Sequence, residues 1–235
     1  GMAVYFDEFV FSSYLNSTDQ TITPETPVVT ALSDAGPRRV MANYDVSHSD
    51  QGFMDTADDS YDEQLFTAMG EAGDHYLTKM FAGTVEASVA YDSIVKISGE
   101  PRSAAVGGAI LLNFDSQGSG GLVRGVVLRN ATVAGAGDGT GQNLGTTVAG
   151  QEFAVIFRVI AVAGGTITMH IEEGAADPPI TDIAALTTTA MAVPGVERYS
   201  IVVPTLAWKR VVIAVGGGFT SATVLVTAGV VMGTG

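Results

Sequence analysis

The chain contains no cysteine among its 235 residues. This absence excludes a disulfide framework, a thiol nucleophile and every cysteine-ligated metal or cluster site. Basic residues are also scarce, because 11 Lys and Arg stand against 25 Asp and Glu, for a net charge of −14. Nucleic acids and anionic membranes are bound through clustered Lys and Arg. We therefore expect no nucleic-acid partner and no membrane partner.

Long hydrophobic runs are missing as well. The longest apolar stretch, residues 153–165, carries Arg158 and is shorter than the ~18 residues that a transmembrane helix requires. No basic segment followed by an apolar run stands near the N-terminus, so no signal peptide is expected. The prediction is a chain without a transmembrane segment.

The distribution of charge predicts how the chain is organised. Residues 1–105 hold 17 acidic and 5 basic residues, whereas residues 106–235 hold 8 and 6. Glycines and a proline mark the change near residues 99–108. We expect an N-terminal arm or first strand over 1–35, an acidic α+β segment over 36–105 and a β-sandwich over 106–235. The alternative is one continuous domain that carries an acidic helical insertion.

One principal helix is predicted over residues 61–82. Apolar side chains recur there with the 3.6-residue period of a helix face, from Leu65 to Phe81. Ser60 and Glu63 have the spacing of a capping box, and Gly83 suits the position after the last turn. Gly70 and Gly73 lie inside this segment, so either a break near Gly70 or close packing of another backbone is expected.

The second half of the chain is rich in Val, Ile and Thr, separated by Gly, Pro, Asp and Asn. Short strands at this spacing, without helical segments between them, are typical of a β-sandwich or jelly roll. The glycine-rich segment 134–145 is expected to be a mobile loop. Eight strands are predicted: 108–114, 122–132, 153–162, 166–172, 183–190, 197–203, 208–215 and 223–231. The predicted fold class is mainly β, with a jelly-roll or β-sandwich C-terminal half.

Aromatic residues are dense close to the N-terminus. Such side chains seek burial, and an arm that packs on a neighbouring subunit would supply it. The alternative is a first strand or short helix packed on its own domain. The candidates for an assembly arm are Phe6, Phe9, Phe11 and Tyr14.

Carboxylates cluster just before the predicted helix. Hard oxygen ligands suit Ca²⁺, but the spacing does not match an EF-hand loop, and no glycine supplies its tight turn. The alternative is a solvated loop whose acids lead into a helix N-terminus. The candidate Ca²⁺ ligands are Asp55, Asp58, Asp59 and Asp62.

Motifs of catalysis are absent from the sequence. The histidines lack zinc-site spacing, no G-x-S-x-G occurs, and the G-x-G-x-G at 135–139 lacks the context of a dinucleotide loop. His170 and Glu172 share the polar face of a predicted strand, either as a surface pair or as a small polar ligand site. We expect no enzyme and no cofactor. A deep pocket holding two or more of His170, Glu172, Glu173 and Glu152 would reverse that expectation.

The C-terminal run carries a family resemblance. It contains TITMHIEE at 166–173, SIVVP at 200–204, WKRVVI at 208–213 and TVLVTAGVVM at 223–232. This order of strands and turns over residues 108–235 resembles the jelly-roll virion proteins of tailed bacteriophages, which include capsid decoration (cement) and tail-associated proteins. The resemblance transfers no functional residue, and this sequence departs from the pattern at Trp208 and Val211.

The resemblance implies a structural protein of a phage or prophage virion, assembled in the bacterial cytoplasm. Its partners would be copies of itself, in a trimer or higher ring, and other virion proteins. The alternative function is a carbohydrate- or ligand-binding β-sandwich, assisted by Ca²⁺ through the acidic cluster. Trp208, the only tryptophan, would be the residue of interest there, because sugar-binding platforms usually expose an aromatic side chain.

Overall fold

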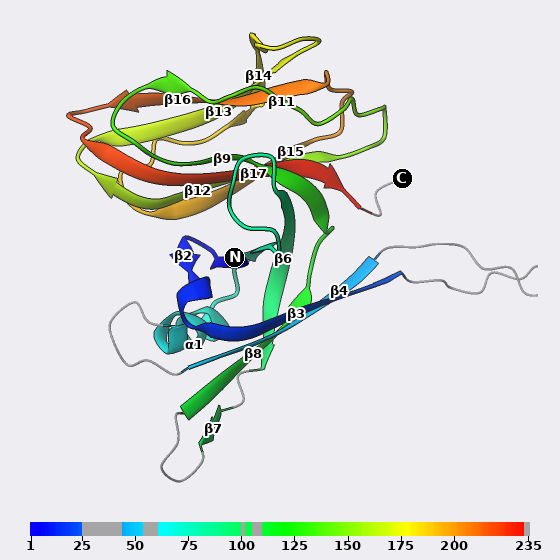
Figure 1. Ribbon diagram of the computed structural model, residues 1–235, viewed down its shortest axis with the longest axis vertical. Helices are drawn as coiled ribbons and strands as arrows, with labels where there is room; N and C mark the ends of the chain where they lie inside the picture. The colour runs from blue at the N-terminus through cyan, green and yellow to red at the C-terminus, as the bar shows by residue number, and fades with distance from the viewer. Residues whose placement is uncertain (25–43, 54–60, 100–101, 105–109, 233–235) are drawn as a thin grey trace, which may run out of the picture. The chain divides into compact units, whose positions relative to one another are not determined.

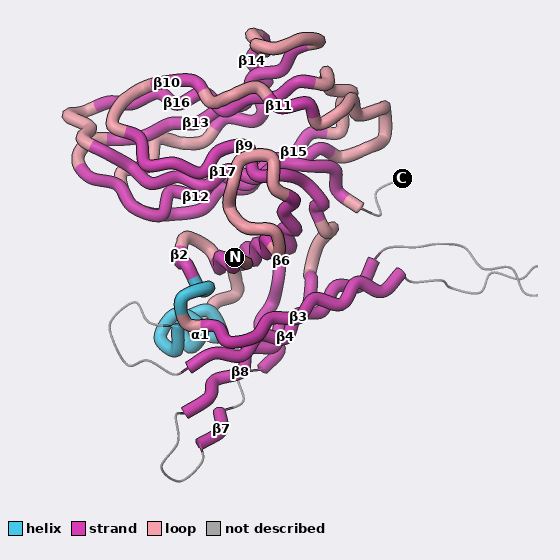
Figure 2. Tube along the Cα trace, viewed as in Figure 1, coloured by secondary structure: helices cyan, strands magenta, loops and turns pink. Residues whose placement is uncertain are grey.

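The computed structural model describes residues 1–24, 44–53, 61–99, 102–104 and 110–232. Antiparallel strands make up most of the described chain, and the described part contains one α-helix (Figure 2). The residues form two compact units that are discontinuous in sequence. The first comprises Gly1–Ser12, Tyr76–Asp92 and Val123–Gly235, and the second comprises Ser13–His75 and Ser93–Leu122. This division differs from the three consecutive segments predicted from composition, because residues near the N-terminus join the C-terminal half.

The first unit contains a two-layered jelly roll (Figure 1). One sheet has the strand order β15-β12-β17-β9, and the other has β14-β13-β16, with β10 and β11 both paired to β16. With β10 and β11 counted as one interrupted strand, eight consecutive strands follow the jelly-roll order 1-8-3-6 and 2-7-4-5. The strands are β9 (Val123–Val133), β10 (Gly137–Asp138), β11 (Gln142–Asn143), β12 (Phe153–Ala163), β13 (Thr166–Gly174), β14 (Thr181–Thr187), β15 (Gly195–Ile201), β16 (Trp208–Gly216) and β17 (Ser221–Val231). The predicted fold class is confirmed.

The core of the jelly roll lies between its two sheets. Alternate residues of each strand point inward, so Ile167, Met169 and Ile171 of β13 are fully buried, as their period of two predicts. Aromatic residues from β12 and aliphatic residues from β16 and β17 fill the rest. All eight predicted strands are present, but the first of them, β8 (Ile110–Gly118), belongs to the second unit.

The outer face of the β12-β17-β9 sheet is buried as well. It meets β1 (Ala3–Phe6), which pairs with β5 (His75–Met80), and Tyr5 and Met80 pack there against Val127 and Leu225. β2 (Phe9–Val10) extends β1, and the 3-10 helix η1 (Phe11–Ser13) follows it. A sheet covered on both faces requires apolar residues on both. The unbroken burial of residues 153–159 in β12 reflects this requirement.

The second unit is built on a long hairpin. β3 (Leu15–Pro24) pairs with β4 (Tyr44–Phe53), which pairs with β8. β6 (Val89–Gly99) pairs with β9 through Val89–Asp92 and with β8 through Val95–Gly99. β7 (Arg102–Ala104) pairs with β8. The helix α1 (Tyr61–Gly70) buries Leu65 and Ala68. No described helix is long and apolar enough to cross a membrane.

Two predictions of local structure are wrong. The predicted helix 61–82 breaks at Gly70, which is one of the two outcomes expected for its glycines, but no described helix follows the break. Residues 75–80 form the strand β5, which pairs with β1 and buries Leu77 and Met80. The glycines oppose helix continuation, and burial in the sheet outweighs the helical periodicity. The predicted loop 134–145 forms β10 and β11 and pairs with β16. Ser60 of the predicted capping box lies outside the described residues.

The close contact of β9 with β17 depends on two glycines. Gly125 and Gly229 face each other in register, and a Cβ at Gly229 would lie 2.4 Å from the Arg124 carbonyl oxygen. We expect Gly229→Ala to lower the free energy of unfolding by about 1–3 kcal/mol, because backbone cannot move aside cheaply. Urea denaturation measures this, with Gly195→Ala, which meets no atom within 4 Å, as the control. Equal stability of both variants would contradict the packing described.

Candidate functional site

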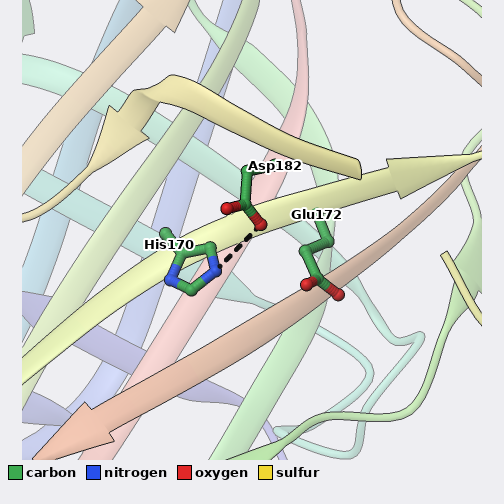
Figure 3. Close-up of side chains that lie close together, drawn as sticks. All are labelled: His170, Glu172 and Asp182. Atoms are coloured by element: carbon green, nitrogen blue, oxygen red, sulfur yellow. Dashed lines mark ion pairs between the residues drawn. The ribbon is translucent and has the colours of Figure 1, made fainter. Parts of the chain in front are cut away.

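Three potential metal-ligating side chains meet on the β14-β13-β16 sheet (Figure 3). Because alternate residues of β13 enter the core, His170 and Glu172 point to the opposite face. Asp182 comes from β14, where an irregularity in the register places it opposite Glu172, whereas His170 faces Thr187. His170 Nε2 lies 3.3 Å from Asp182 Oδ1, and one ligand atom from each of the three residues lies within 4.8 Å of the others.

An arginine on the neighbouring strand orients this cluster. Arg210 of β16 lies opposite Glu172 and donates from Nε to Glu172 Oε2 at 2.5 Å. Its Nη1 lies 3.0 Å from Asp138 Oδ2 of β10. The glycine-rich segment therefore supplies a carboxylate that pairs with an arginine, which is opposite to the requirement of a phosphate cradle.

The polar pair predicted from β13 thus gains a member that sequence reasoning missed. Asp182 follows a turn and has no fixed spacing from His170 that a motif could reveal. The other two acids considered for an enzyme lie in different ion pairs: Glu173 Oε2 is 3.5 Å from Lys209 Nζ, and Glu152 Oε1 is 3.0 Å from Arg198 Nη2. The structure does not bring these carboxylates together with His170.

The Ca²⁺ candidates fall mostly outside the description. Asp55, Asp58 and Asp59 lie beyond the described residues, and Asp62 stands half-buried in the first turn of α1. Within the described ranges, the only group of three or more potential metal ligands is His170, Glu172 and Asp182. Among the described residues, the group best suited to bind a cation therefore lies on the jelly roll, and one of its members is a histidine.

The aromatic residues of the expected arm take different positions. Phe6 and Phe11 are each 1% exposed and stack with ring centroids 5.2 Å apart. These two residues are therefore packed within their own unit, as the alternative to an assembly arm predicts. Phe9 and Tyr14 are partly exposed. They are therefore the members of the set with surface to offer a neighbouring subunit.

A buried arginine fastens the N-terminal strand to the jelly roll. Arg158 projects from the outer face of β12 and is fully buried. Its Nε donates to the carbonyl oxygen of Asp7 at 2.6 Å, and its Nη2 donates to that of Tyr76 at 3.0 Å. Its Nη1 lies 3.9 Å from Asp92 Oδ1. One side chain thus joins the segments around β1, β5 and β6 to β12.

Burial dominates the electrostatics of this pair. It raises the pKa of the Asp92 carboxyl, and the Arg158 charge and the hydroxyl of Thr78 partly oppose that rise. Burial also lowers the pKa of Arg158, which Asp92 opposes. A buried charge without a partner is costly, so each group is tolerable largely because the other is present.

Comparison with known proteins gives weak structural similarity. No protein-family model matches the chain, and no curated protein matches it. A chain of the native gene transfer agent virion is 16% identical with a TM-score of 0.43, over 52% of this chain and 94% of its own. A chain of the tail of the empty gene transfer agent particle is 18% identical with a TM-score of 0.38, over the same shares. The Dit protein of phage SPP1, titled a paradigm of the hub adsorption apparatus, is 8% identical with a TM-score of 0.39, over 99% of this chain and 100% of its own.

Removing the Arg158 guanidinium should leave the buried carboxylate of Asp92 without its ionic partner. We expect Arg158→Met to lower the free energy of unfolding by about 3–5 kcal/mol, and Asp92→Asn in the same chain to restore part of it. A carboxyl whose folded pKa is raised destabilises the fold in full above that pKa, and the penalty falls with pH from there until it vanishes below the ordinary pKa of the group. The loss in Arg158→Met should therefore be larger at pH 8 than in mild acid. Urea denaturation at several pH values measures this, and a double variant no more stable than Arg158→Met would contradict the pairing.

Proposed function

We propose that this protein is a structural component of a tailed-phage virion, in capsid decoration or in association with the tail. It acts by assembling with copies of itself and with other virion proteins, and it performs no catalysis. The jelly-roll topology supports the proposal, because the strand pattern of residues 166–232 resembles virion proteins of that fold and the strands form as expected. Two of the compared structures are titled as the virion and the tail of a gene transfer agent particle, and the third as a hub protein of phages.

The observation that carries the proposal is a set of exposed apolar side chains on two adjoining loops. Thr147 Oγ1 lies 3.0 Å from Thr205 Oγ1 and 2.9 Å from the Thr205 amide nitrogen, which joins loop 144–152 to loop 202–207. The four apolar side chains that these loops expose, at 41–63%, are Val148, Val202, Val203 and Leu206. They are called the loop patch below.

A buried lysine holds one side of the loop patch in place. Lys209 is fully buried in β16, and its Nζ donates to the carbonyl oxygen of Leu206. The same Nζ lies 3.5 Å from Glu173 Oε2, which accepts from the Leu206 amide nitrogen at 2.7 Å. Burial lowers the pKa of Lys209, and Glu173 opposes that shift. These bonds hold the backbone at Leu206, beside the exposed residues.

Such a surface suits association. Exposed apolar side chains on neighbouring loops lose contact with water when a partner covers them, and a backbone already held by hydrogen bonds loses little conformational entropy on binding. Copies of one chain usually associate with closed symmetry. A trimer or higher ring is the form that the resemblance to virion proteins implies. The contacts with other virion proteins would use other faces of each copy.

Charge placed on the loop patch should disrupt assembly. We expect the wild-type chain to have a mass that is a multiple of 24.2 kDa in size-exclusion chromatography with light scattering, equally in EDTA and in CaCl₂. The double variant Val202→Asp, Val203→Asp should approach 24.2 kDa, because buried carboxylates oppose association.

The matched control for this experiment is Val85→Asp. Val85 is 73% exposed and lies in the first unit, outside the two loops, so this variant should keep the wild-type mass. A wild-type chain that stays monomeric at high concentration would contradict the proposal. An equal loss of mass in Val85→Asp would show that charge, and not the loop patch, governs assembly.

A second candidate function is binding of a carbohydrate, and a groove in the first unit favours it. The groove has a volume of about 430 Å³ and is lined by Trp208, Leu144 and Val126, with Glu86 and Asn143 at its polar side. An aromatic face beside a carboxylate and an amide is suited to sugar rings and their hydroxyl groups.

The groove contains the only tryptophan, so fluorescence excited beyond the absorption band of tyrosine reports on it alone. If sugars bind there, titration with soluble oligosaccharides should change the Trp208 emission saturably, and Glu86→Gln should weaken the effect about tenfold or more. Glu71→Gln, an exposed carboxylate in the second unit, is the control. Unchanged emission across the oligosaccharides would remove this second candidate.

A further inference from the structure

We propose that His170, Glu172 and Asp182 form a binding site for one zinc ion, which links β13 to β14. This site lies beyond the assembly function proposed above and does not depend on it. Three protein ligands leave a fourth position for water, the arrangement that zinc adopts in open sites. The three side chains come from two neighbouring strands and converge on one face of the sheet (Figure 3).

The spacing of the donor atoms suits tetrahedral zinc. Bonds of 2.0–2.1 Å to nitrogen and oxygen place two ligands of a tetrahedron about 3.3 Å apart. His170 Nε2 and Asp182 Oδ1 are 3.3 Å apart, and the three donor atoms all lie within 4.8 Å of one another.

The kinds of donor atom select the metal. An imidazole nitrogen with two carboxylate oxygens suits a first-row divalent metal such as zinc, whereas Ca²⁺ takes six to eight oxygen ligands and Mg²⁺ keeps an octahedral shell of oxygens. His170 is largely shielded, with 21% of its side chain exposed, whereas the Asp182 side chain is 66% exposed. The open side of the site therefore faces water, which gives an ion a path of entry and supplies the fourth ligand.

The surrounding charges suit a divalent cation. Arg210 donates to Glu172 Oε2 and orients that carboxylate, and Asp138 balances part of the arginine charge. With neutral His170, the three carboxylates and one guanidinium of this group carry a net charge of −2. Hydrogen bonds to a ligating carboxylate orient it and support metal binding. Arg210 is a positioning residue in this arrangement.

The site also lies where the strand pairing is irregular. β14 pairs with β13 at His170 and Thr187 and again at Glu172 and Asp182, so a step of two residues along β13 corresponds to a step of five along β14. A metal held by His170 and Asp182 would join the two strands across this break. Zinc binding is therefore expected to stabilise the edge of the jelly roll, since a ligand of the folded state raises stability by mass action.

The first test is zinc binding by the full chain after treatment with chelator. Isothermal titration with ZnCl₂ should show one high-affinity ion per chain, and Zn²⁺ should raise the melting temperature where equal CaCl₂ or MgCl₂ does not. Co²⁺ bound in place of Zn²⁺ should give the visible absorption of a four-coordinate site. Absence of binding, or an equal effect of Ca²⁺, would overturn the proposal.

Substitutions then assign the ligands. His170→Gln and Asp182→Asn should each weaken zinc affinity about tenfold to hundredfold and abolish the Co²⁺ spectrum, and the exposed Asp182 allows its variant to fold normally. Asp177→Asn, an exposed carboxylate in the turn before β14, is the control and should bind as the wild type does. Full affinity in both ligand variants would overturn the assignment. These readouts do not require assembly, so failure here leaves the proposed virion role untouched.

Discussion

Burial of one sheet on both of its faces is the constraint that organises the first unit. The strands β12, β17 and β9 pack on one side against the second sheet of the jelly roll and on the other against β1 and β5. The side chain of Arg158 projects from β12 toward β1 and β5. There it donates to the backbone at Asp7 and Tyr76 and faces Asp92. The N-terminal strand is thereby part of the fold of the C-terminal half.

The outer face of the other sheet of the jelly roll is not covered in this way by the described residues and carries polar side chains. The outer side of the β14-β13-β16 sheet carries charged residues, of which Glu172, Arg210 and Asp138 form an ion-pair network. At one end of the sandwich, the buried Lys209 and the partly exposed Glu173 bond the backbone of a loop that exposes apolar side chains. The buried face thus provides stability, whereas the polar face and the loops are left for partners and ions.

Sequence reasoning reached the jelly roll because its strands are short, rich in β-branched residues and separated by turn residues. It failed where two periodicities compete. Residues 75–80 continue an apolar helical pattern from α1, but they pair with β1 as a strand, and only the tertiary contacts of Leu77 and Met80 decide this. The glycine-rich segment was expected to be mobile, yet it pairs with β16 because an edge strand offers it hydrogen bonds.

Only part of the candidate site could be predicted from the sequence, because part of it depends on local alternation and part on long-range pairing. Alternation along β13 places His170 and Glu172 on one face, and this is a local property. Asp182 reaches them only through the irregular pairing of β14, and Arg210 only through its register with β13. Long-range register is set by the whole sheet, so no spacing along the chain reveals these partners.

The central claim is that this protein belongs to a phage particle, and the composition of purified particles tests it most directly. Tailed particles induced from the strain that encodes the chain would be purified on a density gradient and quantified by mass spectrometry. The account predicts that the protein sediments with the particles, in a fixed number of copies relative to the other virion proteins. Its absence from the particles, with the protein abundant in the lysate that produced them, would contradict the account.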